Sequence, residues 1–272
     1  MIDRPNRPRS IAPAATIVAL LSGLSPLGTA AAAEETAPNS GSSFFETFDS
    51  LDRQRWYISD GWSNGDHQNC TWSREQVAVE NGALHLTFDG SAEGEGEHVC
   101  GEVQTNARFG YGVYEVRMKA AEGSGLNSGF FTYIGPVHEQ PHDEIDFEVL
   151  GKDPSKVQVN YYVDGENGGV EKLVPVEGGA ASGFNDYAFV WEEDRIAWYV
   201  NGELVNEVSD AAKLPSHASK IYMSIWGSDT LTSWMGRFAD PSEPKVMEVD
   251  HVAFTAPGEQ CQFPDSIVCT MD

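Results

Sequence analysis

The chain has 272 residues, and its 42 Asp and Glu side chains outnumber its 17 Lys and Arg side chains, so its formal net charge at pH 7 is −25. A surface this acidic repels nucleic acids and anionic membranes, and we expect neither as a partner. Strong charge of one sign also favours solubility and a monomer, which is the oligomeric state that we predict.

The first 33 residues have the pattern of a secretory signal peptide. Three arginines within the first nine residues precede an apolar stretch at 11–24, and Ala31-Ala32-Ala33 provides an A-x-A cleavage site. The apolar stretch is too short and too interrupted to predict a membrane span, and no later segment approaches about 18 apolar residues. We therefore predict export to the periplasm or the extracellular medium, with an uncleaved surface anchor as the alternative.

Residues 34–43 lack apolar periodicity and predict a flexible leader to one folded domain at 44–256. Within that domain, short segments of alternating apolar and polar residues are separated by turn pairs such as Asn81-Gly82 and Asp164-Gly165. The segments predicted to be β-strands are 83–88, 113–118, 157–163, 186–191, 196–200 and 220–226. This pattern predicts an all-β fold, and a sandwich or jelly roll is favoured over a barrel.

The four cysteines are Cys70, Cys100, Cys261 and Cys269. An even number in an exported chain suggests two disulfides, and four cysteines allow three connectivities. We favour the two local pairs, Cys70 with Cys100 and Cys261 with Cys269, so that the second pair staples a C-terminal tail at 257–272. Free buried thiols are the alternative, and no C-x-x-C or His/Cys cluster indicates zinc.

The segment 143–150, Asp-Glu-Ile-Asp-Phe-Glu-Val-Leu, places carboxylates at Glu144, Asp146 and Glu148 with apolar residues between them. Alternation with a period of two is typical of a half-buried strand, so the three carboxylates share the face opposite the core. Like charges on one face are unfavourable and raise the pKa of at least one carboxyl group. The pattern therefore suggests a functional role, although a solvated acidic face without chemistry is the alternative.

Retaining glycoside hydrolysis is one chemistry that uses such a pair of carboxyl groups, about 5–5.5 Å apart. The α-carbons of Glu144 and Glu148 lie about 13 Å apart on a strand, so the two side chains must lean toward each other. Asp146 lies between them, where it can hydrogen-bond one glutamate and help to separate the two pKa values.

The motif Glu144-x-Asp146-x-Glu148 resembles the E-x-D-x-E signature of glycoside hydrolase family 16. Other segments are similar to the bacterial lichenases of that family, which are endo-β-1,3-1,4-glucanases: 69–72, 109–115, 130–136 and 149–153. The resemblance covers about 44–256. Segments 60–62 and 67–73, with the cysteine tail, look closest to endo-β-glycanases of soil bacteria that depolymerise succinoglycan, a β-glucan with acidic substituents.

This resemblance implies a concanavalin-like β-jelly roll of two antiparallel sheets with a substrate cleft on the concave face. It implies Glu144 as the nucleophile, Asp146 as the assisting carboxylate and Glu148 as the acid/base. The implied activity is retaining hydrolysis, by double displacement, of a mixed-linkage β-glucan or an exopolysaccharide backbone such as succinoglycan, without a catalytic cofactor. A non-catalytic, lectin-like sandwich and a transglycosylase on the same fold are the alternatives.

The resemblance also points to residues that bind the substrate. Sugar rings stack on aromatic side chains while polar groups bind their hydroxyls, although each aromatic residue taken alone is more often part of a core. The candidate aromatic platforms are Trp62, Phe131, Tyr133, Tyr162 and Trp226. The candidate polar contacts are Asn64, Glu102, Asn160 and Glu171.

Two positions depart from the lichenase pattern, and one matches a metal position. His142 stands where lichenases usually have Trp, and Gln104 stands where they have Arg. We expect these changes to alter substrate binding and to leave the type of reaction unchanged. Relatives often hold a structural calcium ion through backbone oxygens and an Asp, and Asp250 stands at that place, so a structural Ca²⁺ at Asp250 is also expected.

Overall fold

The structure is a computed structural model that describes residues 41–90, 98–209 and 213–271. The predicted signal peptide lies outside the described residues, as does the predicted leader apart from 41–43. Within those three residues, the Gly41 N–H donates to the Arg108 carbonyl, and the Ser43 hydroxyl accepts from the Ala256 N–H. No helix in the described part of the chain is long and apolar enough to cross a membrane.

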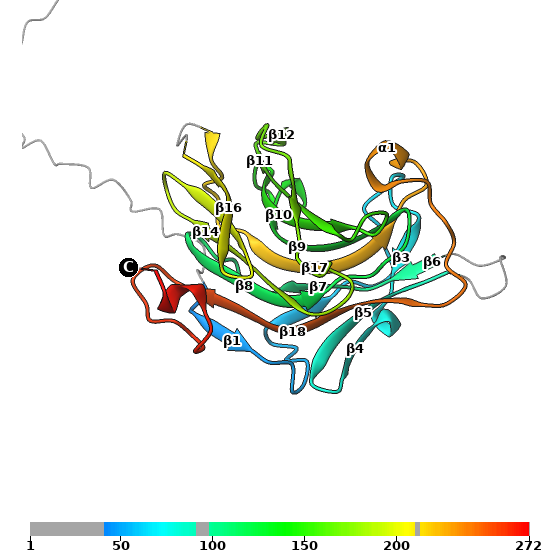
Figure 1. Cartoon of the computed structure of the whole chain (residues 1–272), viewed down its shortest axis with the longest axis horizontal. Helices are drawn as coiled ribbons and strands as arrows, with labels where there is room; N and C mark the ends of the chain where they lie inside the picture. Colours follow the sequence, from blue (N-terminus) through cyan, green and yellow to red (C-terminus); the bar gives the residue numbers. More distant parts are fainter. Residues whose placement is uncertain (1–40, 91–97, 210–212, 272) are drawn as a thin grey trace, which may run out of the picture. The chain divides into compact units, whose positions relative to one another are not determined.

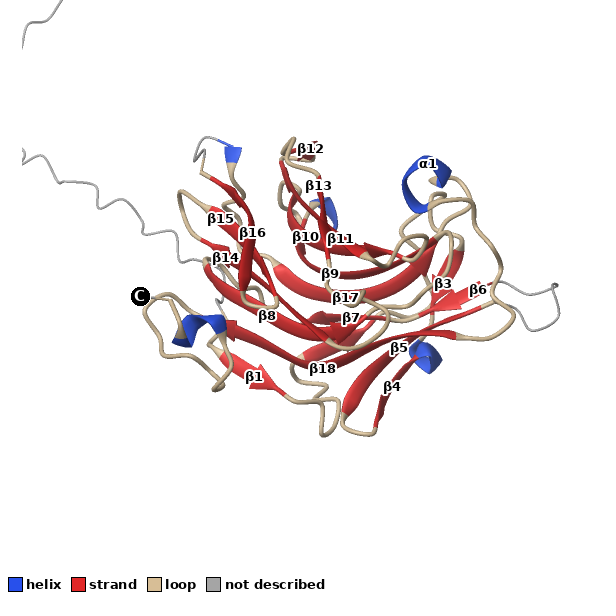
Figure 2. Cartoon of the chain, viewed as in Figure 1, coloured by secondary structure: helices blue, strands red, loops and turns tan. Residues whose placement is uncertain are grey.

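Two β-sheets lie face to face (Figures 1 and 2). In spatial order, the outer sheet contains β16 (Glu203–Val208), β15 (Ile196–Val200), β14 (Asn185–Trp191), β8 (Gly112–Lys119), β18 (Lys245–Thr255), β5 (Ala83–Asp89), β6 (His98–Cys100) and β3 (Cys70–Trp72), with β1 (Phe44–Glu46) beside β18 and β4 (Val77–Glu80) beside β5. The inner sheet contains β12 (Glu166–Asn167), β11 (Lys156–Val163), β10 (Asp143–Leu150), β9 (Leu126–Ile134), β17 (Lys220–Gly227), β7 (Glu102–Thr105) and β2 (Trp56–Ile58), with β13 (Lys172–Pro175) beside β11.

The remaining elements are short. They are α1 (Thr232–Met235) and the 3-10 turns Arg74–Gln76, Pro136–His138 and Ile267–Cys269. The inner sheet is curved, and its concave face points away from the outer sheet (Figure 1). All described strand pairs are antiparallel except β3 with β6, so the predicted jelly roll is confirmed with one parallel pair.

Alternation explains why these segments form strands. All six predicted strand segments are strands, and in each the apolar set points between the sheets. In β10 the apolar residues Ile145, Phe147 and Val149 are at most 1% exposed, and they pack into the core between the sheets. The turn pair Asn81-Gly82 between β4 and β5 has positive φ at both residues, as a tight hairpin turn requires.

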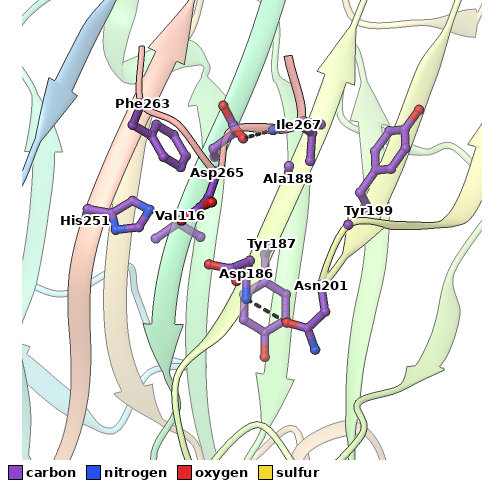
Figure 3. Close-up of a pocket in the computed structure, with 12 residues that line it drawn as sticks. Val116, Asp186, Tyr187, Ala188, Tyr199, Asn201, His251, Phe263, Asp265 and Ile267 are labelled. Carbon is purple, nitrogen blue, oxygen red and sulfur yellow. Dashed lines mark hydrogen bonds between the residues drawn. The ribbon is translucent and has the colours of Figure 1, made fainter. Parts of the chain in front are cut away.

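The structure contains both predicted disulfides, Cys70–Cys100 and Cys261–Cys269. The first joins β3 to β6, and the second closes the C-terminal tail. That tail lies on the outward face of the outer sheet, where the buried carboxylate of Glu115 accepts hydrogen bonds from the Ser266 hydroxyl at 2.6 Å and the Ile267 N–H at 2.8 Å. A pocket of about 180 Å³ separates the tail from β14 (Figure 3).

We expect Phe147→Ala to lower the free energy of unfolding by about 3–5 kcal/mol, because it leaves a cavity between the sheets where Phe147 packs against Tyr187 and Phe189. Urea denaturation of the mature protein measures the change. Leu173→Ala is the matched control, since Leu173 is 54% exposed and should change the stability by less than about 0.5 kcal/mol. Equal effects of the two substitutions would contradict the placement of β10.

Candidate active site

Strand β10 lies between β9 and β11 at the floor of the concave face. Residues that pair across strands share a face, so the register shows which side chains surround each carboxylate. The pairs are Tyr133 and Tyr162 beside Glu144, Phe131 and Asn160 beside Asp146, and Gly129 and Gln158 beside Glu148. Four of the predicted substrate-binding residues, Phe131, Tyr133, Asn160 and Tyr162, therefore flank the three carboxylates.

Glu144 is hydrogen-bonded to His142, whose Nε2 atom is 2.6 Å from Glu144 Oε2. This hydrogen bond raises the pKa of His142, and burial opposes the rise. The imidazole stacks on Tyr162 with ring centroids 5.4 Å apart and meets the Tyr133 ring edge-on at 5.1 Å. The sequence analysis predicted only that His142 replaces an aromatic platform. The structure shows in addition that His142 is hydrogen-bonded to Glu144.

Asp146 is the most buried of the three carboxyl groups, at 3% exposure. Burial and then the neighbouring Glu144 and Glu148 raise the pKa of Asp146 well above its usual value. Its Oδ2 atom has no hydrogen-bond partner in the described part of the chain. A protonated Asp146 has a hydrogen to donate to Glu144, so it can assist that carboxylate without adding a third negative charge.

Glu148 holds a proton at neutral pH. Burial, together with the charges of Glu144 and Glu171, raises the pKa of Glu148 to about 8. A hydrogen bond that Asn127 donates to Glu148 Oε1 at 2.8 Å has the opposite effect and lowers this pKa. A carboxyl group that is protonated near neutral pH is what a general acid needs. The strand therefore presents one glutamate paired with a histidine and another that carries a proton.

On one side of the triplet, β7 brings Glu102 and Gln104 into the concave face, where they pair with Ser224 and Tyr222 of β17. Glu102 is buried and accepts a hydrogen bond from the Ser59 hydroxyl at 2.6 Å, and burial raises the pKa of Glu102 to about 8. Gln104 Oε1 accepts from Lys220 Nζ at 3.0 Å and from the Tyr222 hydroxyl at 3.2 Å. The Tyr222 ring also stacks on Phe131, with centroids 5.1 Å apart.

On the other side, a groove of about 610 Å³ runs beside β11. Tyr162, Gln158 and the predicted Glu171 line it, together with Trp234 of α1. Trp234 Nε1 donates to Gln158 Oε1 at 2.7 Å, and its ring centroid is 6.1 Å from that of the predicted Trp226. The concave face thus continues on both sides of the carboxylates.

Trp62 and Asn64 lie on the loop that follows β2, and His67 of the same loop meets the Trp226 ring edge-on, with centroids 5.7 Å apart. Trp62 is 40% exposed with its ring edge-on to Trp72, and the Asn64 N–H is hydrogen-bonded to Gln68. No contact recorded for the described residues joins either one to the carboxylates. Their role in binding the substrate stays a prediction.

Several cleft residues were missed by the sequence analysis although the same alternation places them. Lys220 and Tyr222 share the face of Trp226 on β17, Asn127 shares the face of Phe131 on β9, and Gln158 shares that of Asn160 on β11. Extending the period of two from the predicted residues finds them. Trp234 carries no such signal, because it belongs to a one-turn helix outside the sheets.

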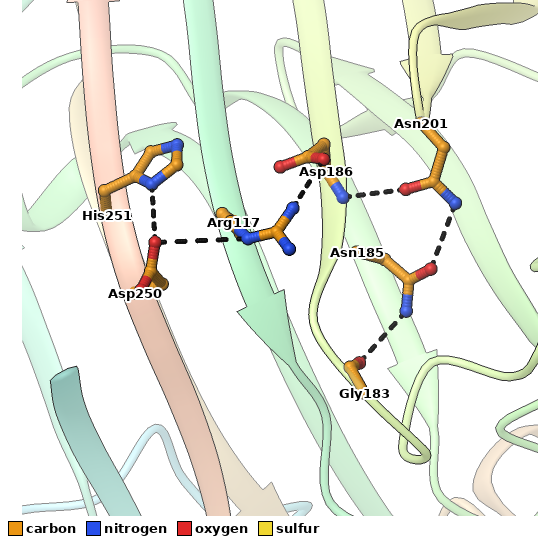
Figure 4. A network of polar contacts seen from close by, with 7 residues as sticks. All are labelled: Arg117, Gly183, Asn185, Asp186, Asn201, Asp250 and His251. Carbon is orange, nitrogen blue, oxygen red and sulfur yellow. Dashed lines mark hydrogen bonds and ion pairs between the residues drawn. The ribbon is translucent and has the colours of Figure 1, made fainter. Parts of the chain in front are cut away.

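Asp250, the expected calcium ligand, lies on β18 of the outer sheet (Figure 4). Its Oδ2 atom is 2.8 Å from His251 Nδ1 and 4.0 Å from Arg117 Nε, and Arg117 also pairs with Asp186 at 2.7 Å. Within the described ranges, no three His, Cys, Asp or Glu side chains gather as metal ligands. The expected calcium ion would be held mainly by backbone oxygens, so the side chains do not test it, and calcium at Asp250 stays a prediction.

A family model described as "Glycosyl hydrolases family 16" matches residues 64–242. The chain belongs to this family. It is 60% identical over 230 residues to the endo-1,3-1,4-beta-glycanase ExoK of Rhizobium meliloti (strain 1021), covering 85% of each chain. It is 41% identical over 217 residues to a beta-glucanase of Paenibacillus macerans, covering 79% of this chain and 89% of that one. Among solved structures, the beta-glucanase of Bacillus licheniformis matches with a TM-score of 0.76 and 36% identity, over 80% of this chain and all of that one.

Family membership makes the protein a glycoside hydrolase, and it confirms the resemblance drawn from the E-x-D-x-E motif. It therefore decides for the hydrolase over the lectin-like alternative. Hydrolases of this family use no catalytic cofactor. The carboxylate strand on the concave face of this fold supplies the groups that glycoside hydrolysis requires.

We expect Glu102→Gln to raise the free energy of unfolding at pH 7 by on the order of 2 kcal/mol. The raised pKa means that folded Glu102 keeps a proton that the unfolded chain has lost, so its contribution falls as the pH rises from about 4.5 to about 8. Glutamine removes this dependence. Urea denaturation at pH 7 and pH 4 measures it, with exposed Glu203→Gln as the control. A gain of the same size at pH 4 would contradict the assignment.

Proposed function

We propose that the protein is an exported endo-β-1,3-1,4-glucanase that hydrolyses a mixed-linkage β-glucan or an exopolysaccharide backbone such as that of succinoglycan, with retention of configuration. The observation that carries the proposal is the pair of glutamates on β10: Glu148 is held protonated, and Glu144 is paired with His142. The names of the relatives, an endo-1,3-1,4-beta-glycanase and beta-glucanases, support the class of substrate.

The proposed mechanism is double displacement. Glu144 attacks the anomeric carbon while Glu148 gives its proton to the leaving oxygen, which forms a glycosyl-enzyme and frees the first product. Glu148, now ionised, takes a proton from water, and the resulting attack on the anomeric carbon releases Glu144. Asp146, whose pKa is raised by burial and by the two neighbouring glutamates, supports Glu144 with a hydrogen bond.

The walls of the concave face suit a sugar chain. Phe131 with Tyr222 on one side, and Tyr162 with His142 on the other, present stacked rings beside the carboxylates, and sugar faces pack on such rings. The buried amide of Asn160 has an oxygen without a partner in the described part of the chain, which leaves it available to a sugar hydroxyl. Because the face continues on both sides of the triplet, a chain can lie across it, as endo-cleavage requires.

The proposal includes export but not a metal ion. The signal-peptide pattern and the two disulfides favour an oxidising compartment, either periplasmic or extracellular, and a monomer is expected from the net charge. The calcium ion at Asp250 stays an expectation from the resemblance, since the contacts of that carboxylate are with His251 and Arg117.

Glu144→Gln should lower kcat on lichenan by at least about 10³-fold, because an amide cannot form the glycosyl-enzyme. The variant should keep the affinity for lichenan oligosaccharides, since the ring walls and Glu148 are unchanged. Release of reducing ends measures turnover, and calorimetry with the oligosaccharides measures binding. Glu203→Gln on the outer sheet controls for the loss of one charge. A near wild-type rate for Glu144→Gln would contradict the proposed role of Glu144 as the nucleophile.

The pH profile tests Glu148. The acid must be protonated, so kcat/KM should be high below the pKa of Glu148 and fall as the pH rises through about 8. Asn127→Ala removes the hydrogen bond that lowers this pKa, and the alkaline limb should therefore move to higher pH. Asn206→Ala, on β16 of the outer sheet, should leave the limb in place. A limb that stays or moves to lower pH in Asn127→Ala would reject Glu148 as the acid.

A further inference from the structure

A lysine lies in the same row of the cleft as Glu144. Lys220 on β17 pairs in register with Tyr133 on β9, and Tyr133 pairs with Glu144 on β10. Two strand spacings separate the α-carbons of Lys220 and Glu144 by about 10 Å. The half-buried ammonium group donates to Gln104 Oε1 at 3.0 Å. A positive charge therefore lies beside the catalytic row.

Two further basic side chains connect to this lysine through hydrogen bonds. The Tyr222 hydroxyl bonds to Gln104 Oε1 at 3.2 Å and lies 3.1 Å from His138 Nε2. Arg108 Nη2 donates to the carbonyl oxygen of His138 at 3.3 Å. We call Arg108 and Lys220 the cation cluster; His138, whose lowered pKa leaves its imidazole uncharged at neutral pH, lies between them in the chain of hydrogen bonds. Two separate parts of the chain contribute its members.

The cation cluster has no carboxylate partner in the described part of the chain, whereas six other cations there are ion-paired: Arg55, Arg74, Arg117, Lys119, Lys156 and Arg195. Arg53, Lys152, Lys172, Arg237 and Lys245 also have no such partner, but all of these except Lys245 are exposed, while both members of the cluster are half-buried. Burial, and then repulsion from Arg108, lower the pKa of Lys220, and burial with the charges of Lys220 and Arg108 lowers that of His138. The members thus repel one another in a chain of net charge −25.

Glu102, Glu144 and Asp143 do not neutralise the cluster. Glu102, on the strand that carries Gln104, is protonated at neutral pH and engaged by Ser59. Glu144 is paired with His142. Asp143 accepts from His217 Nδ1 and from three backbone N–H groups, those of Asp164, Ser216 and His217. A half-buried group of cations without a counter-ion is stabilised by an anion from outside the protein.

We propose that the cation cluster is a subsite for a carboxylate carried by the polysaccharide substrate, such as an acidic substituent on a sugar next to the cleaved bond. This inference rests on the proposed function, and it narrows the substrate to acidic β-glucans. A carboxylate there can accept hydrogen bonds from Lys220 and Arg108, in place of the neutral amide of Gln104 and the backbone of His138.

The subsite also resolves an electrostatic conflict. The acidic surface of the protein repels an acidic polymer at long range, but salt screens this repulsion beyond about 10 Å at 0.1 M ionic strength. Inside the cleft, the local cations then determine the sign of the interaction. The cluster therefore selects acidic chains where the bond is cleaved.

The test compares lichenan with lichenan succinylated at a low degree, using the ratio of kcat/KM on the acidic polymer to kcat/KM on the neutral one. We expect Lys220→Met to lower this ratio about tenfold, because a charge-assisted hydrogen bond is lost. Lys245→Met on β18 of the outer sheet makes the same change in net charge and should leave the ratio as in the wild type. Added salt should lower the ratio of the wild type more than that of Lys220→Met.

A ratio that Lys220→Met leaves unchanged would overturn the subsite, as would an equal loss on both polymers. A sulfated lichenan that is cleaved in preference to the succinylated one would overturn the assignment to carboxylate. If Lys220→Met does not fold, Arg108→Gln takes its place in the same comparison. Binding of both polymers to Glu144→Gln tests the subsite apart from catalysis, so that an inactive wild type would contradict the proposed function alone.

Discussion

The burial of one face of β10 between the sheets fixes the position of every group in the cleft. Ile145, Phe147 and Val149 enter the core, and a shift of one residue would exchange them for the three carboxylates. The cost of burying those charges makes any other register untenable. Neighbouring strands are fixed in the same way, so the residues that flank the carboxylates are determined by packing on the far side of the sheet.

The same burial gives the three carboxyl groups different properties. All three stand on one strand, yet Asp146 is buried, Glu148 is half-buried and hydrogen-bonded to Asn127, and Glu144 is hydrogen-bonded to His142. Desolvation favours the protonated forms of the first two, and each remaining negative charge adds to that effect. Environment therefore separates chemically similar groups into distinct roles, which a catalytic pair requires.

Local pattern in the sequence predicted the strands, the shared face of the carboxylates and the two disulfides, because each depends on spacing of a few residues or on a small number of cysteines. It did not predict the partners of these groups. Gln104 and Lys220 are 116 residues apart, and Asn127 and Glu148 are 21 apart. Such contacts follow from the order of strands in the sheet, and the alternation within one strand carries no information about which strand lies beside it.

The two departures from the lichenase pattern have a common physical sense. Gln104 stands where an Arg was expected, and the sequence alone reads this as a lost charge, but Lys220 on the neighbouring strand donates to that glutamine. The positive charge is therefore retained on the next strand, about 4.8 Å away, where Lys220 pairs with Tyr133 in the row of Glu144. His142 in turn replaces an apolar ring with one that hydrogen-bonds Glu144 and still stacks on Tyr162. The first exchange thus keeps a positive charge in the cleft and the second makes the cleft more polar, and both suit a backbone that carries charged groups.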